Sequence, residues 1–178
     1  MTAYIYRQPL AFKGRPTRLA APLNIDQAIL GASYQWTDNG VGQPVIFDTD
    51  GQLAPVTTTT TAADIVGVIA ALYGGFAGLG TNNAYPPVTT PVQLTSRCMP
   101  FMRWGYIGVA VQNTTMPVRG GKVYVRISLP SSNPQGLVVG GFEAAADTSD
   151  TASTIEIPGW TFQGAPDSNG ITEIYIAR

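Results

Sequence analysis

Glycine and proline interrupt this chain too often for a fold built from long helices. Its 178 residues include 20 glycines and 14 prolines, and both residue types break helices. Between them, apolar and polar residues alternate over short runs, which is the pattern of strands with one buried face. The length is that of one domain. We therefore expect an all-β fold, a β-sandwich or a β-barrel made from several short strands.

The alternation is clearest in residues 122–127. There it predicts that Val123 and Val125 face the interior, while Tyr124 and Arg126 face the solvent. The same kind of reasoning predicts further strands at residues 44–47, 52–56, 64–70, 92–98, 104–111, 154–159 and 171–176.

Local signals predict how some of these segments begin and end. The step from Asp50 to Gly51 predicts a hairpin turn, since glycine accepts a positive φ. Residues 24–31 carry the cap signals and the apolar spacing of a short helix. Pro158 is expected to end its strand, and residues 74–87 to form a long glycine-rich loop.

The residue types that are missing exclude several kinds of site. The chain has no histidine and one cysteine, which excludes Ser-His-Asp triads, histidine metal sites and an intrachain disulfide. A formal net charge of −1 gives no field that would draw the protein to nucleic acid or a membrane. We expect no cofactor, no metal, no nucleic-acid or membrane partner, and synthesis in a reducing host cytoplasm. We expect Cys98 to pack as a small apolar residue.

Other candidate sites have simpler structural explanations. Asp48 could begin a calcium loop, but the twelfth position is Thr59 where the motif needs glutamate, so a hairpin turn is favoured. Most carboxylates lie near turn residues, which favours solvated acids over a catalytic pair. Trp36, Trp104 and Trp160 are expected to anchor a core or an interface rather than to form a sugar-binding platform.

Residues 1–22 differ from the rest of the chain. They carry four positive charges and no negative one, and their prolines favour extended backbone. This composition fits a frayed terminus or an arm that orders on a neighbouring subunit. We expect the arm, because aromatic and arginine side chains anchor interfaces. The expected interface residues are Tyr4, Tyr6, Arg7, Phe12, Lys13, Arg15 and Arg18. Acids that follow Arg126 could complement this arm on the next subunit or could simply favour solubility.

The order of motifs in the second half resembles one known family. The motifs are the runs 103–109, 118–126, 141–144, 157–162 and 174–178. In this order they resemble the cement, or capsid decoration, proteins of tailed bacteriophages, over roughly residues 40–178. The resemblance implies a compact β-barrel or β-tulip-like (jelly-roll-like) domain. It also implies homo-oligomers on the capsid exterior, at junctions between capsomers of the major capsid protein, and no enzyme activity.

These observations together predict a structural virion protein. We expect an extended arm in residues 1–22 and the β-domain in residues 23–178. The expected partners are the major capsid protein and the protein itself, as a homotrimer or, alternatively, a dimer. Two other functions remain open: a tail or spike component that binds a host glycan, and a hydrolase that uses a carboxylate pair.

Overall fold

Strands and turns make up the described part of this chain. The computed structural model describes residues 13–18, 24–31, 33–34, 41–70, 98–112, 115–133, 136–147 and 153–177. Its strands are β1 (Asn24–Ile29), β2 (Pro44–Phe47), β3 (Leu53–Pro55), β4 (Ile65–Ile69), β5 (Cys98–Ala110), β6 (Lys122–Arg126), β7 (Phe142–Glu143), β8 (Thr154–Phe162) and β9 (Ile171–Ile176). Within these ranges there is no helix, and hence none that could cross a membrane. The all-β prediction is confirmed.

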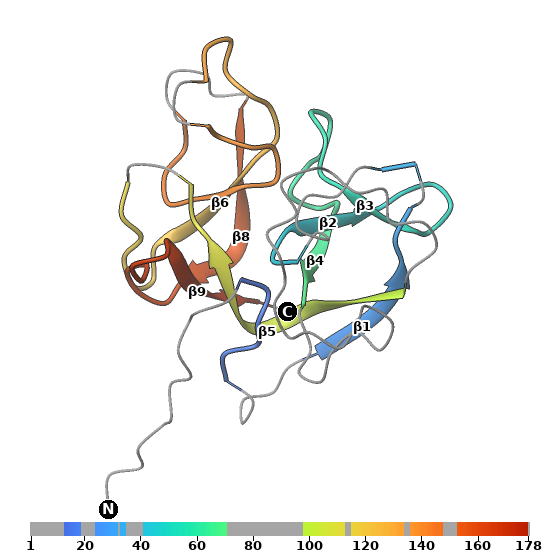
Figure 1. Cartoon of the computed structure of the whole chain (residues 1–178), viewed down its shortest axis with the longest axis horizontal. Coiled ribbons are helices and arrows are strands. Elements are labelled where there is room, and N and C mark those ends of the chain that lie inside the picture. Colours follow the sequence, from blue (N-terminus) through green and yellow to red (C-terminus); the bar gives the residue numbers. More distant parts are fainter. Residues whose placement is uncertain are drawn as a thin grey trace, which may run out of the picture.

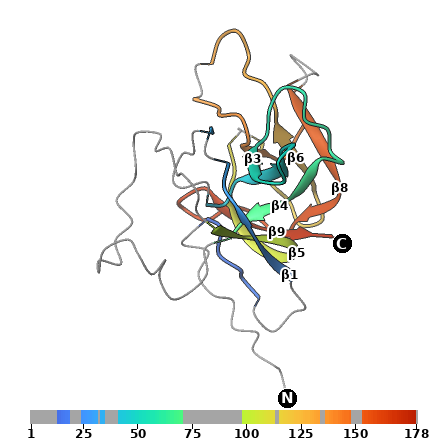
Figure 2. The same cartoon turned by 90° about the vertical axis from the view of Figure 1, so that its right-hand side faces the viewer.

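Strand β5 runs through the middle of the molecule and belongs to both halves of the sheet (Figure 1). Its first part pairs with β1, from Cys98 to Trp104, and with β4 at Phe101 and Met102. From Gly105 onward it pairs with β9 instead. Gly105 has a φ of 127°, a conformation that favours glycine. Figure 2 shows β1, β5 and β9 side by side.

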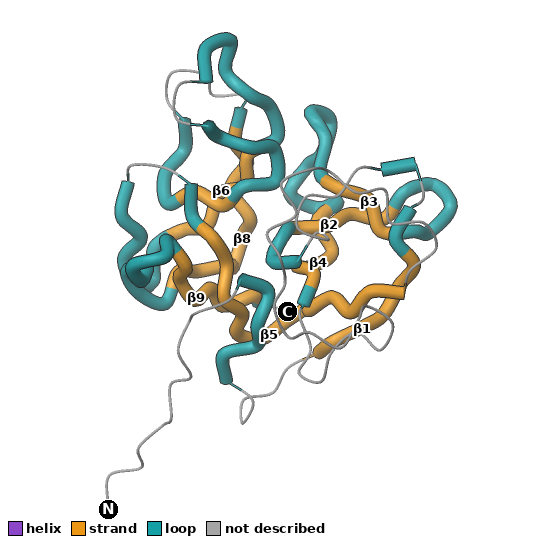
Figure 3. Tube along the Cα trace, in the orientation of Figure 1, coloured by secondary structure: helices purple, strands orange, loops and turns teal. Residues whose placement is uncertain are grey.

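The first part of β5 completes what we call the first ring, in the order β1-β5-β4-β2-β3. Leu30, directly after β1, closes this ring through a parallel bridge to Leu53 of β3. Figure 3 shows the strands of this ring on the right. Apolar side chains fill its interior: Leu30, Val41, Val45, Leu53, Ile69, Met99 and Phe101. The predicted hairpin at Asp50 and Gly51 joins β2 to β3 and is confirmed.

The second part of β5 completes the second ring, in the order β5-β9-β8-β6-β7. Val111, directly after β5, closes it through a parallel bridge to Phe142 of β7. Val123 and Val125 are buried in its core, as the alternation predicts. Val68 and Met102 of the first ring pack into the same core, so that the two rings share an apolar interface.

Two local predictions are wrong. Residues 24–29 form the strand β1, because pairing along their whole length with Cys98 to Trp104 of β5 outweighs their weak local preference for helix. Pro158 does not end β8, which continues to Phe162. The register between β6 and β8 shifts at this point, and Gly159 has a φ of 80°, so the proline lies in a bulge.

Candidate functional site

Residues 13–18, which we call the anchored segment, lie along the edge of β5 that β9 leaves open. The Gly14 N–H donates to the carbonyl of Gly108 (2.6 Å), and the Gly108 N–H donates to the carbonyl of Arg15 (2.9 Å). The Thr17 N–H donates to the carbonyl of Tyr106 at 3.0 Å. Gly14 has a φ of 76°, and a Cβ there would overlap Val41 of the first ring. The anchored segment therefore contacts both rings.

A buried carboxylate holds the end of this segment. Glu173 of β9 is fully buried and accepts hydrogen bonds from Arg18, with Nη2 to Oε2 at 2.5 Å and Nε to Oε1 at 3.2 Å. The Thr17 hydroxyl donates to the same carboxylate. The Arg18 guanidinium also lies over the ring of Tyr106, 3.9 Å from its centroid. The hydrogen bond to Glu173 is the main cause that raises the pKa of Arg18.

The predicted arm residues fall into two groups. Lys13, Arg15 and Arg18 belong to the anchored segment and are half-buried against their own chain. The remaining four lie outside the described residues: Tyr4, Tyr6, Arg7 and Phe12. The acidic partner of Arg18 is thus Glu173 of the same chain. Sequence alone does not distinguish this pairing from one between subunits, since both need the same two charges.

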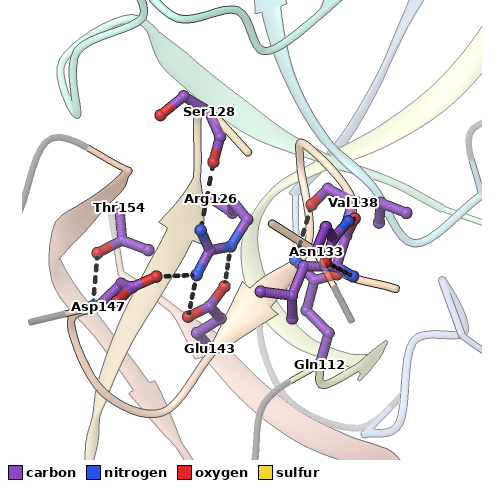
Figure 4. A network of polar contacts seen from close by, with 9 residues as sticks. Gln112, Arg126, Ser128, Asn133, Val138, Glu143, Asp147 and Thr154 are labelled. Atoms are coloured by element: carbon purple, nitrogen blue, oxygen red, sulfur yellow. Dashed lines mark hydrogen bonds and ion pairs between the residues drawn. The ribbon is translucent and has the colours of Figure 1, made fainter. Parts of the chain in front are cut away.

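A second buried ionic cluster centres on Arg126, which is 1% exposed although the alternation predicts that it faces solvent. Its Nε donates to Oε1 of Glu143 at 2.5 Å, and its Nη2 to Oδ2 of Asp147 at 2.8 Å (Figure 4). Nη1 donates to the carbonyl of Ser128 at 3.3 Å. Burial lowers the pKa of Arg126, but the hydrogen bonds to Glu143 and Asp147 leave it raised.

The expectation that acids lie in solvated turns is therefore wrong for two of them. Glu143 and Glu173 are both fully buried, and both accept hydrogen bonds from an arginine. A buried carboxylate needs such a partner because it has lost its water. Each of these two carboxylates joins segments that are distant in sequence, which is a structural role.

A feature that the sequence analysis missed lies between β6 and β7, in the described residues 127–133 and 136–141, which we call the apolar loop. Gln112 forms two hydrogen bonds with Val138 of this loop: Nε2 donates to the carbonyl, and Oε1 accepts from the N–H, each at 2.7 Å. Asn133 holds Leu137 in the same way, at 2.7 and 2.8 Å (Figure 4). A Cβ on Gly141 would overlap the side chain of Gln112. The backbone of Leu137 and Val138 is therefore held in place by side chains.

The remaining candidate residues have structural explanations or lie outside the described residues. Cys98 is exposed, with its Sγ 3.6 Å from Oε1 of Gln27, so the expectation that it is packed is wrong. Trp160 is buried in the core of the second ring, and Trp104 packs against it. Trp36 lies outside the described residues. The described part of the chain holds no group of three or more His, Cys, Asp or Glu that could hold a metal ion.

Comparisons with known proteins give two findings. The family model described as "Structural cement protein (E217 gp24/Pam3 gp6)" matches residues 1–177. The fold is similar to a chain from the structure described as "The capsid of Myoviridae Phage XM1", with a TM-score of 0.65 and 16% sequence identity. That likeness covers 100% of this chain and 95% of the other. No curated protein matches the sequence.

Proposed function

The chain belongs to the family of phage structural cement proteins, and from this membership we propose that it binds the outside of a phage head and bridges capsomers of the major capsid protein. Membership makes it a structural protein of the virion capsid, which confirms the resemblance drawn from the motifs between residues 103 and 178. The observation that carries the proposal is a family match over nearly the whole chain. We also propose that the protein has no enzymatic activity.

The fold supports a role in which contact area matters more than chemistry. One continuous strand, β5, belongs to both rings, and a common apolar core joins them. A rigid body of this kind loses little conformational entropy when it binds. A molecule that binds the assembled shell and not the dispersed subunits stabilises the shell by mass action. Many copies on one lattice act together, so each contact can be weak.

We propose further that residues 1–12 contact a neighbouring subunit through Tyr4, Tyr6, Arg7 and Phe12. The anchored segment supports this division, because residues 13–18 are bonded to their own chain. Lys13, Arg15 and Arg18 then belong to the segment that attaches the arm to its own β-domain. For the free protein a homotrimer is our first proposal and a dimer the alternative.

The experiment adds purified protein to heads assembled from the major capsid protein alone. We expect the protein to sediment with the heads and to raise the temperature at which they disassemble. Electron cryomicroscopy of the same particles should show density outside the shell across the boundaries between capsomers. A protein that stays in the supernatant at all concentrations would contradict the proposal.

Two deletions separate the arm from the fold. Removal of residues 1–12 leaves Arg18 and Glu173 paired, so we expect unchanged thermal stability and weaker binding to heads. Removal of residues 1–18 leaves Glu173 buried without Arg18 and Thr17, so we expect a loss of stability as well. Unchanged binding after the shorter deletion would show that the arm does not contact the capsid.

The glycan-binding alternative receives less support from the structure. It needs aromatic rings on the surface, whereas Trp160 is buried and Trp104 packs against the same core. Calorimetry with host saccharides tests it directly, and we expect no heat of binding.

A further inference from the structure

The apolar loop is unusual for its composition and exposure. It projects at the top of Figure 1, and no charged residue lies between Arg126 and Glu143. Leu129 is 47% exposed, Val138 52% and Val139 37%.

The same loop is held in place more firmly than a connection requires. Gln112 and Asn133 each supply both a donor and an acceptor to the loop backbone, as a neighbouring strand would. Gly141 makes room for Gln112, whose N–H donates to the carbonyl of Phe142 at 2.9 Å. These contacts fix Leu137 and Val138 before any partner is present.

An ion pair joins the two charged residues that flank the apolar loop. Arg126 precedes the loop and Glu143 follows it, and they form a two-contact ion pair in the interior (Figure 4). Arg126 also binds the carbonyl of Ser128, at the start of the loop. Buried ion pairs contribute little net stability because both charges lose their water. What this pair does supply is a fixed position for both ends of the loop.

We propose that the apolar loop is a preformed docking surface, and that Leu129, Val138 and Val139 insert into an uncharged, apolar depression on the major capsid protein. The inference rests on the proposed function and deepens it by naming the contact. Aliphatic side chains on a rigid loop bind without the entropy cost of ordering it. The absence of charge requires an uncharged partner, since a charge covered by these side chains would lose its water without gaining a hydrogen bond.

The capsid is a better occupant than a second copy of this chain. A stable dimer buries about 800 Å² on each partner, far more than three half-exposed aliphatic side chains can supply. A small contact is nevertheless useful on a shell, where many copies and several contacts per copy act together.

The test measures binding to heads assembled from the major capsid protein, with the double variant Val138→Ser and Val139→Ser and the single variant Leu129→Ser. Both side-chain sets are exposed, so the melting temperature should not change. We expect the double variant to bind at least about tenfold more weakly. The matched control is Val118→Ser, because Val118 is 65% exposed but lies outside the apolar loop. It should bind as the wild type does.

A second variant tests preorganisation and leaves the aliphatic side chains in place. Gln112→Ala removes the two hydrogen bonds to Val138, so the loop has to be ordered on binding, and we expect weaker attachment. Gln163→Ala is its control, because Gln163 bonds only to the nearby Thr161 through its side chain in the described contacts. It should bind as the wild type does.

The outcomes distinguish this inference from the proposed function. Wild-type protein that does not bind heads overturns the proposed function. Wild-type binding that the loop variants leave unchanged overturns the docking surface alone, as does an equal loss in Val118→Ser. Loop variants that change self-association by light scattering, but not binding to heads, would identify a second copy as the occupant and overturn our assignment.

Discussion

The two rings are built in the same way but keep different interiors. Each uses part of β5, and each is closed by one parallel bridge, at Leu30 in the first and at Val111 in the second. The core of the first ring is apolar. Among the described residues, the fully buried charged side chains all belong to the second: Arg126, Glu143 and Glu173. The stability of the first ring therefore depends on how well its apolar side chains pack. The stability of the second ring depends also on the ion-pair partners of its buried charges.

The largest expected effect comes from breaking a charge pair in the second ring. Glu143→Ala leaves Arg126 buried with Asp147 as its remaining acidic partner. Loss of one member of a buried pair costs about 3–5 kcal/mol, and we expect the lower end because Asp147 stays. Urea unfolding measures the cost.

The control for this prediction is Glu156→Ala, since Glu156 pairs with Lys122 on the surface at 2.9 Å. An exposed pair contributes about 0–1 kcal/mol. If both variants lost the same stability, the burial of the Arg126 cluster would not matter energetically, and the contrast between the rings would fail.

The next largest effect tests the close packing of the first ring. A Cβ on Gly67 of β4 would overlap the carbonyl oxygen of Met102 on β5. Backbone cannot move away as a flexible side chain can, so Gly67→Ala should cost about 2 kcal/mol in urea unfolding. Gly120→Asn is the control, because nothing lies within 4 Å of its Cβ position and asparagine tolerates a φ of 78°. If Gly67→Ala lowered the free energy of unfolding by less than Gly120→Asn does, β4 and β5 would be able to move apart at no cost.

The smallest effect concerns a carboxylate on the surface of the first ring. The Thr61 N–H and the Thr61 hydroxyl both donate hydrogen bonds to Asp64. Both bonds lower the pKa of the Asp64 carboxyl below its ordinary value of 3.8, the N–H having the larger effect. Because the lowered pKa means that folding favours the ionised carboxylate, the Asp64 hydrogen bonds stabilise the folded state above the ordinary pKa of an aspartate. This stabilisation is lost as the pH falls through the lowered pKa of Asp64. Thr61→Val should raise the pKa of Asp64 part of the way back in an NMR titration. Thr59→Val should leave it unchanged; a shift of equal size there would rule out the Thr61 hydroxyl as a cause.

The sequence predicted the fold class because strand alternation depends on local pattern alone. Val123 and Val125 are buried as expected, and the turn at Gly51 forms where glycine permits it. Alternation predicts which face of a strand Arg126 occupies, but it does not predict what covers that face. For this reason it wrongly predicts that Arg126 is exposed to solvent. Arg126 is buried with acids that come 17 and 21 residues later, at Glu143 and Asp147.

The candidate surfaces were less predictable for a similar reason. The charges of Arg18 and Glu173 were visible in the sequence, but pairing within one chain and pairing between two chains have the same residue pattern. The apolar loop does have a signal in the sequence, which is an uncharged run flanked by opposite charges. Its bracing by Gln112 depends on tertiary structure, because Val138 lies 26 residues away.

The sharing of β5 also decides when the molecule can acquire its structure during synthesis. A ribosome that has released β1 to β4 has not yet made the strand that joins β1 to β4, and the second ring has to wait for β9 near the end of the chain. The first ring can therefore close once β5 has been made, whereas the second ring stays open until β9 follows. Pairing between such distant segments is slow to form. The nascent chain therefore keeps an edge of β5 unpaired from Gly105 onward until β9 emerges, and during that interval it most needs protection from aggregation.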